Sequence, residues 1–82
     1  MLTPAQLRAA LALIGWKPSD LAEASGVHRN TINNFAFAPK PSNPSRKTLI
    51  AWSRALSRAG VEFIGATDKH GPGVMLRDPK SE

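Results

Sequence analysis

Residues 21–35, with the sequence LAEASGVHRNTINNF, predict two short helices that are joined by a tight turn. Ala22 is small enough for the second helix to cross close to the first. Gly26 tolerates the left-handed backbone conformation that a tight turn after a helix requires. Val27 and Ile32 place apolar side chains where they would fix the crossing angle. The stretch therefore predicts a helix pair of defined geometry.

The second helix of this pair, expected at residues 28–35, has a polar outer surface. His28 is predicted to cap it, while Ile32 and Phe35 face inward. Asn and Thr are mediocre helix formers, so this surface serves something other than helix stability. Five polar residues form it: Arg29, Asn30, Thr31, Asn33 and Asn34.

Two further helices are expected on either side of the pair. Residues 4–14 follow a capping box made by Thr3 and Gln6, and residues 46–59 follow the N-cap residue Ser45. A loop with three prolines, which forbid helix, precedes the last helix. Both helices carry an apolar stripe at helical spacing: Leu7, Leu11 and Ile14 in the first, and Leu49, Trp52, Ala55, Leu56 and Ala59 in the second.

The aromatic side chains are interpreted mainly as core. Trp16 and Trp52 each stand within an apolar pattern, which favours packing over base stacking. For Phe37 two alternatives stay open, because it follows the second helix of the pair directly. It either covers the core from the loop or lies exposed.

The C-terminal segment differs in kind from the helices. Residues 61–64 and 74–77 are short and partly alternating, which predicts a β-hairpin. In one alternative the hairpin covers the helical core of its own chain. In the other it pairs with the hairpin of a second subunit, which would remove exposed edges and supply two-fold symmetry. We favour the second alternative, with an interface of Val61, Phe63, Val74 and Leu76.

Charge is distributed unevenly along the chain. The 82 residues carry a net charge of +5, and residues 24–61 contain no Asp or Glu. A positive field on one part of the chain points to a polyanionic partner, of which nucleic acid is the commonest. The alternative is a solvated basic surface without a partner. Six cations lie in this stretch: Arg29, Lys40, Arg46, Lys47, Arg54 and Arg58.

Several classes of protein are disfavoured by composition. The absence of cysteine excludes disulfides, thiolate zinc sites and thiol catalysis. The N-terminal residues do not resemble a signal peptide and no apolar run is long enough for a membrane span, so a cytoplasmic, nucleoid-associated protein is expected. His28 and His70 have no acidic cluster beside them, and Asp20 with Glu23 does not resemble a catalytic pair. We expect no enzymatic activity, metal or cofactor.

The helix pair and its flanks resemble the Cro/repressor-type helix-turn-helix of the XRE family, small bacterial or phage DNA-binding regulators with the lambda-repressor-like fold. The resemblance covers residues 2–60, and the tail resembles a short extension of small bacterial members. It implies a mainly α fold of four to five helices followed by a short C-terminal β-hairpin. The expected domains are a helix-turn-helix at residues 1–60, a dimerisation hairpin at 61–78 and a disordered tail at 79–82.

The chain departs from the family pattern at both ends of the motif. Many members have Ser or Thr before the first helix of the pair and Gln at its start, whereas this chain has Lys17 and Pro18. A common phosphate contact from that Gln is therefore lost. The Glu that usually follows the second helix is replaced by the sequence Ala-Phe-Ala at residues 36–38.

The resemblance also implies roles for individual residues. Arg suits guanine through O6 and N7, and Asn suits adenine through N6 and N7. Base-edge contacts are therefore expected from Arg29, Asn30, Asn33 and Asn34. Free N–H groups at the start of the last helix also favour phosphate. Contacts to the DNA backbone are expected from Lys17, Ser19, His28, Thr31, Lys40, Arg46 and Lys47.

The function implied is a sequence-specific regulator of transcription that binds double-stranded DNA. The expected form is a dimeric repressor that recognises a short inverted repeat, with the helix at residues 28–35 in the major groove. The alternative is an antitoxin or a phage-type interaction module whose tail binds a protein partner.

Overall fold

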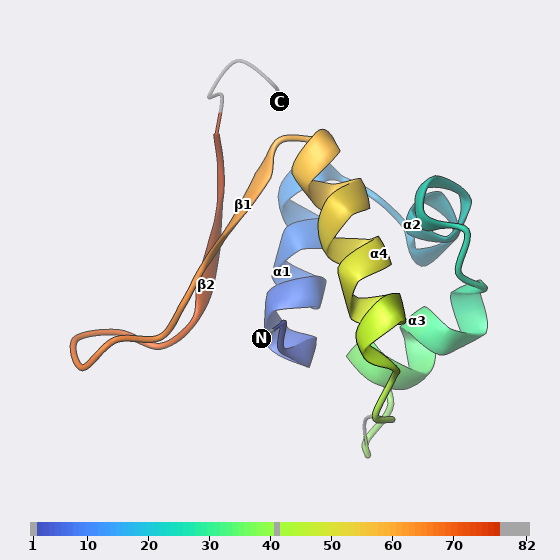
Figure 1. Cartoon of the computed structure of the whole chain (residues 1–82), viewed down its shortest axis with the longest axis horizontal. Helices are drawn as coiled ribbons and strands as arrows, with labels where there is room; N and C mark the ends of the chain where they lie inside the picture. The colour runs from blue at the N-terminus through green and yellow to red at the C-terminus, as the bar shows by residue number, and fades with distance from the viewer. Residues whose placement is uncertain (1, 41, 78–82) are drawn as a thin grey trace.

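The computed structural model describes residues 2–40 and 42–77, which form four helices and one two-stranded antiparallel sheet (Figure 1). The predicted mainly α fold with a C-terminal hairpin is confirmed. The expected tail at 79–82 lies outside the described residues. The elements are α1 (Pro4–Ile14), α2 (Pro18–Ser25), α3 (Arg29–Ala36), α4 (Arg46–Arg58), β1 (Val61–Ile64) and β2 (Gly73–Leu76).

The helices begin and end where local chemistry directs them. Thr3 and Gln6 form the predicted capping box at the start of α1. The Ser45 hydroxyl accepts the Thr48 N–H at 3.2 Å and so caps α4. Gly26 ends α2 in the left-handed conformation with φ of 77°, as the turn requires. Compared with the prediction, α3 is one residue longer and the second strand begins one residue earlier.

The four helices enclose a core around Trp52, which is fully buried. Its ring lies against Phe35, with the ring centroids 5.4 Å apart. Trp16 packs against this core from its margin and stays partly exposed. The other fully buried large side chains come from every layer of the fold: Leu7, Leu21, Ile32, Leu56 and Val61.

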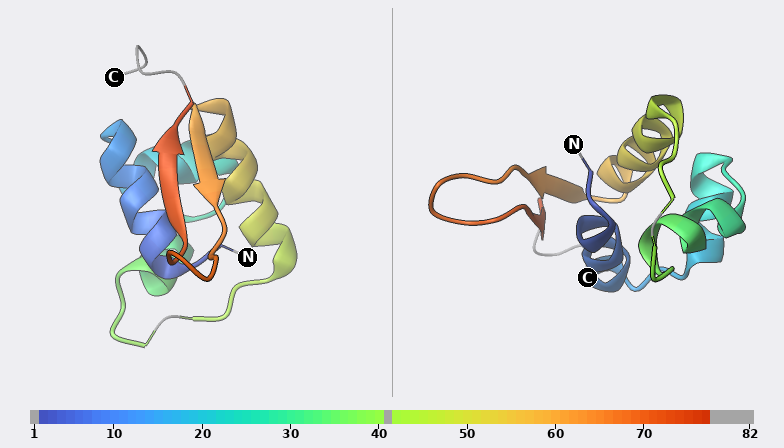
Figure 2. Two further views of the ribbon diagram at one scale, coloured as in Figure 1. Left: turned by 90° about the vertical axis from the view of Figure 1, so that its left-hand side faces the viewer. Right: turned by 90° about the horizontal axis from the view of Figure 1, so that it is seen from below.

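The hairpin packs across α1 and α4 (Figure 2). Its register pairs Val61 with Leu76 and Phe63 with Val74, so these four side chains share one face. Val61 is buried, and Phe63 and Val74 pack against the helical core. The first alternative, a hairpin that covers its own chain, therefore describes this inner face. Pairing with a second hairpin stays a prediction and concerns the strand edges.

Side chains fasten the hairpin to the helices at both of its ends. The buried Gln6 amide donates to the carbonyl oxygens of Ile64 and Gly73, each at 3.1 Å, while its oxygen accepts the Thr3 N–H at 3.0 Å. At the other end, Arg77 donates to the carbonyl and hydroxyl oxygens of Ser57. These contacts fix the hairpin on the helical body.

Candidate nucleic-acid interface

The turn between α2 and α3 follows the packing predicted from the sequence. Leu21 and Ile32 are fully buried, and Ala22 and Val27 pack partly buried against the same core. The Ser25 hydroxyl accepts the Val27 N–H at 3.2 Å, which satisfies a turn amide. These contacts set α3 across α2, on the side of the molecule opposite the hairpin (Figure 1).

The outer face of α3 gathers all four residues predicted to contact bases. Arg29, Asn30, Asn33 and Asn34 are exposed. The buried side of the helix consists of Ile32, Phe35 and Ala36. With about 3.6 residues per turn, Asn30 and Asn34 lie opposite that buried side. Donor and acceptor groups therefore point outward along the helix, with one cation at its beginning.

The residues predicted at phosphates near the start of α3 also lie on the surface. Ser19 and His28 border one shallow hollow of about 440 Å³ between α2 and α3, which the base-contact candidate Arg29 and the acidic Glu23 also line. The His28 Nδ1 accepts the Asn30 N–H at 3.0 Å, as predicted for a cap. In the neutral ring the Nε2–H is then the donor available to a phosphate oxygen. Lys17 is exposed directly before α2, and Thr31 is half-buried within α3.

The remaining three phosphate candidates follow α3 in the chain. Lys40 is exposed in the loop, and Arg46 and Lys47 are exposed in the first turn of α4. The Ser45 cap uses the Thr48 N–H, so the backbone donors left there are the first N–H groups of α4. In the chain these cations thus follow the C-terminal end of α3, while His28 caps its N-terminal end.

Sequence reasoning missed the contacts that hold the end of α3. The Arg8 guanidinium on α1 donates to the carbonyl oxygen of Ala36 at 2.6 Å. The Ser42 N–H donates to the Asn34 carbonyl at 3.1 Å and brings the loop back onto the helix. The end of α3 is thus held from two sides, and the Arg8 contact reaches Ala36, the first of the three residues that depart from the family pattern. Nothing in the local sequence signals a contact between residues 28 positions apart.

Other kinds of site find little support in the described part of the chain. No group of three or more His, Asp or Glu residues there could hold a metal ion. Among the same residues no helix has both the length and the apolar character needed to cross a bilayer.

Comparison with known proteins agrees with this geometry. A family model described as Helix-turn-helix matches residues 7–63, which include all four helices except the first turn of α1. Comparisons with curated proteins and with solved structures find no match. Because the family model covers well over half of the chain, the protein belongs to the helix-turn-helix family of XRE-type DNA-binding regulators of transcription.

Proposed function

We propose that this regulator recognises a specific DNA sequence by placing α3 in the major groove. The observation that carries the proposal is the single outer face of α3, where Arg29, Asn30, Asn33 and Asn34 are exposed together. The major groove is wide enough for a helix and presents a distinct donor and acceptor pattern at each base pair. Each well-formed pair would discriminate its base by about 1–3 kcal/mol.

Affinity is proposed to come mainly from the surrounding cations. Residues 24–61 contain no acidic side chain, and Glu23 in the hollow beside His28 and Arg29 is the acidic neighbour that a phosphate there would meet. His28 caps the N-terminal end of α3 and Lys40 follows its C-terminal end after four residues, so contacts from both would fix the position of α3 on the duplex. Binding should therefore weaken steeply as the salt concentration rises.

We further propose that the protein acts as a homodimer on an inverted repeat. The Arg77 N–H donates to the Gly60 carbonyl at 2.8 Å, which makes these two residues a hydrogen-bonded pair of the ladder. Such pairs alternate along antiparallel strands, so the backbone groups of Val61 and Phe63 point to the open edge of β1. A second β1 edge could pair there and give the symmetry that a palindromic site requires.

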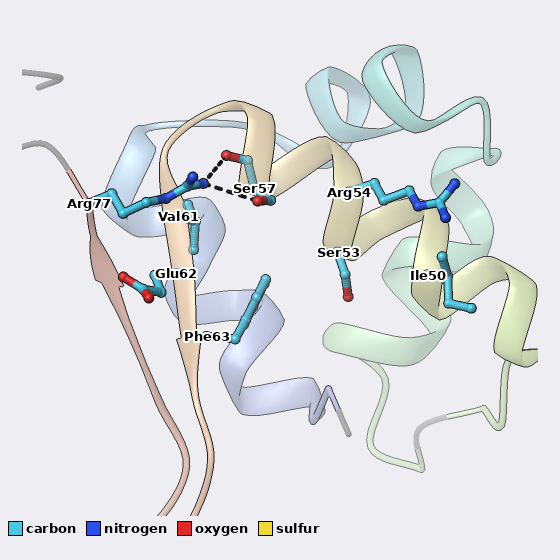
Figure 3. A pocket seen from close by; sticks show the side chains of 8 residues that line it. All are labelled: Ile50, Ser53, Arg54, Ser57, Val61, Glu62, Phe63 and Arg77. Carbon is cyan, nitrogen blue, oxygen red and sulfur yellow. Dashed lines mark hydrogen bonds between the residues drawn. The ribbon is translucent and has the colours of Figure 1, made fainter.

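A groove beside this edge supports the same proposal (Figure 3). It has a volume of about 440 Å³ and lies between α4 and β1. Ile50 contributes an exposed apolar side chain, and Arg54 and Glu62 contribute opposite charges. Opposite charges on one face can pair reciprocally across a two-fold axis.

Repression is the proposed mode of action, because a dimer seated on a promoter blocks it without a further domain. The second candidate function is an interaction module of the antitoxin or phage type. The same groove favours it, since a protein partner could occupy it instead of a second copy. A small toxin gene beside the gene for this protein would favour the second candidate.

Selection of duplexes from a randomised library tests the proposed function. The purified protein should enrich one sequence, arranged as an inverted repeat with half-site centres about 10 base pairs apart. A protein that binds every duplex equally well would contradict sequence recognition. Enrichment of a single half-site would support recognition by α3 and contradict the dimer.

A further inference from the structure

We propose that Phe37 is a further base-reading residue, which contacts the 5-methyl group of a thymine in the major groove. This inference rests on the proposed function, because it needs α3 in that groove. Phe37 is the C-cap residue of α3, and 53% of its surface is exposed. By contrast, the side chain of Phe35, two positions earlier, is only 6% exposed. The structure thus excludes the alternative in which Phe37 covers the core.

Phe37 continues the polar face of α3. It lies seven residues after Asn30, and two helical turns span about 7.2 residues, so both side chains leave the helix in nearly the same direction. The Phe37 N–H donates to the Asn33 carbonyl at 2.9 Å, which keeps its backbone nitrogen in helical register. An exposed aromatic ring therefore closes a row of amides on the face assigned to DNA.

The backbone that carries Phe37 is held in place from outside α3. Arg8 donates to the carbonyl oxygen of Ala36, which belongs to the peptide bond that joins Ala36 to Phe37. The Ser42 N–H on the Asn34 carbonyl returns the loop to the helix one turn earlier. A fixed backbone leaves only the side-chain torsions of Phe37 to be ordered on binding, which lowers the entropic cost of the contact.

The chemistry of the DNA major groove indicates which group Phe37 would contact. Base edges there offer donors, acceptors and one apolar group, the thymine methyl, which pairs with apolar side chains such as Phe. Seven residues at 1.5 Å each separate Asn30 from Phe37 by about 10.5 Å along α3, which is longer than the spacing of neighbouring base pairs. We therefore expect the thymine in the same half-site as the base that Asn30 contacts, but at a different base pair.

A protein partner is a poorer fit to this position. Among residues 2–40 and 42–77 the other exposed large apolar side chains, Leu13, Ile50 and Met75, belong to α1, α4 and the hairpin rather than to α3. The neighbours of Phe37 on the outer face are the amides Asn33 and Asn34. The Phe37 ring is an apolar group beside side-chain amides, within a stretch that has no acidic residue. The thymine methyl is likewise an apolar group beside polar base edges, so the two surfaces are complementary.

The test replaces each thymine of the selected duplex by deoxyuridine, which removes only the methyl group. For the wild-type protein, affinity should fall about fourfold at one position of a half-site, as expected for one buried methyl. Phe37→Ala should lose that sensitivity and keep the response at every other position, and Phe37→Leu should retain part of it. Met75→Ala, which truncates a similarly exposed apolar side chain on the hairpin, is the matched control.

Several outcomes would overturn the inference, and they can be distinguished from failure of the proposed function. If the wild-type protein selects no sequence, the proposed function fails, and this inference fails with it. If a sequence is selected but Phe37→Ala still responds to deoxyuridine at every position where the wild-type protein responds, only this inference fails. Equal weakening of Phe37→Ala on selected and random duplexes would assign the ring to the DNA backbone. A changed sedimentation coefficient would assign it to a protein contact.

Discussion

At the scale of single residues, the side-chain amide of Gln6 links the start of α1 to the far end of the hairpin. We predict that Gln6→Glu lowers the free energy of unfolding by about 2 kcal/mol, because a carboxylate would leave two carbonyl oxygens without their donor. Glu still satisfies the capping box, so the loss belongs to the hairpin contacts. Urea denaturation measures it, with the exposed Glu62→Gln as control. Equal midpoints for Gln6→Glu and the wild type would refute the anchoring role.

Arg29 is predicted to separate specific from non-specific binding. Arg29→Ala should weaken binding to the selected duplex by between about fivefold and about 150-fold, because a fork on guanine O6 and N7 is lost. Binding to a random duplex should change much less, as seen by fluorescence anisotropy at one fixed salt concentration. Lys47→Ala removes the same charge and is the matched control, since it should weaken both duplexes similarly. Equal losses on both duplexes for Arg29→Ala would assign Arg29 to the backbone.

At the scale of elements, the end of α3 depends on a residue of α1. We predict that Arg8→Ala accelerates hydrogen exchange at the Phe37 N–H and weakens binding to the selected duplex by about fivefold, as for one lost hydrogen bond. Arg8→Lys should restore part of both. Arg58→Ala controls for the lost charge on another helix. Unchanged exchange at Phe37 in Arg8→Ala would show that this contact does not position α3.

Local rules of the chain explain how well these elements were predicted. Caps at Thr3, His28 and Ser45 depend on residues within three positions, and each appears in the structure as predicted. The contacts of Gln6 with the hairpin span 58 and 67 positions, and the chain carries no local signal for them. The contact of Arg8 with Ala36 was missed for the same reason, because the two residues are 28 positions apart. The inner position of Val61 also depends on how the hairpin packs, which alternation along one strand does not determine.

At the scale of the whole molecule, the dimer is tested best at the groove rather than by truncation. Removal of the hairpin would take the buried Val61 out of the core, so a lost dimer would be confounded with unfolding. We predict that Ile50→Glu gives a folded monomer with reduced affinity for the inverted repeat, because it places a charge in the proposed interface. Sedimentation velocity measures it. Leu13→Glu, at a similarly exposed position of α1, should stay dimeric. An Ile50→Glu protein that stays dimeric would place the interface elsewhere.

The shape of the molecule assigns different tasks to opposite sides. The hairpin lies on one side of the helical body and α3 lies on the other (Figure 2). The groove is formed between the hairpin and α4. Candidate base reading by α3 and candidate assembly at the groove therefore use different surfaces, so an interface variant should keep the sequence preference of α3 even where its affinity falls. The candidate base-reading residues were predictable because they lie within one helix. Phe37 was not assigned from sequence, because its exposure depends on how α3 ends.

The most direct test of the central claim, that α3 enters the major groove, is methylation interference on the selected duplex. Methyl groups on guanine N7 lie in the major groove, and those on adenine N3 lie in the minor groove. We expect N7 methylation at one or more guanines of each half-site to block binding, and Arg29→Ala to remove the effect at one of them. Interference confined to adenine N3, or none at any base, would contradict it.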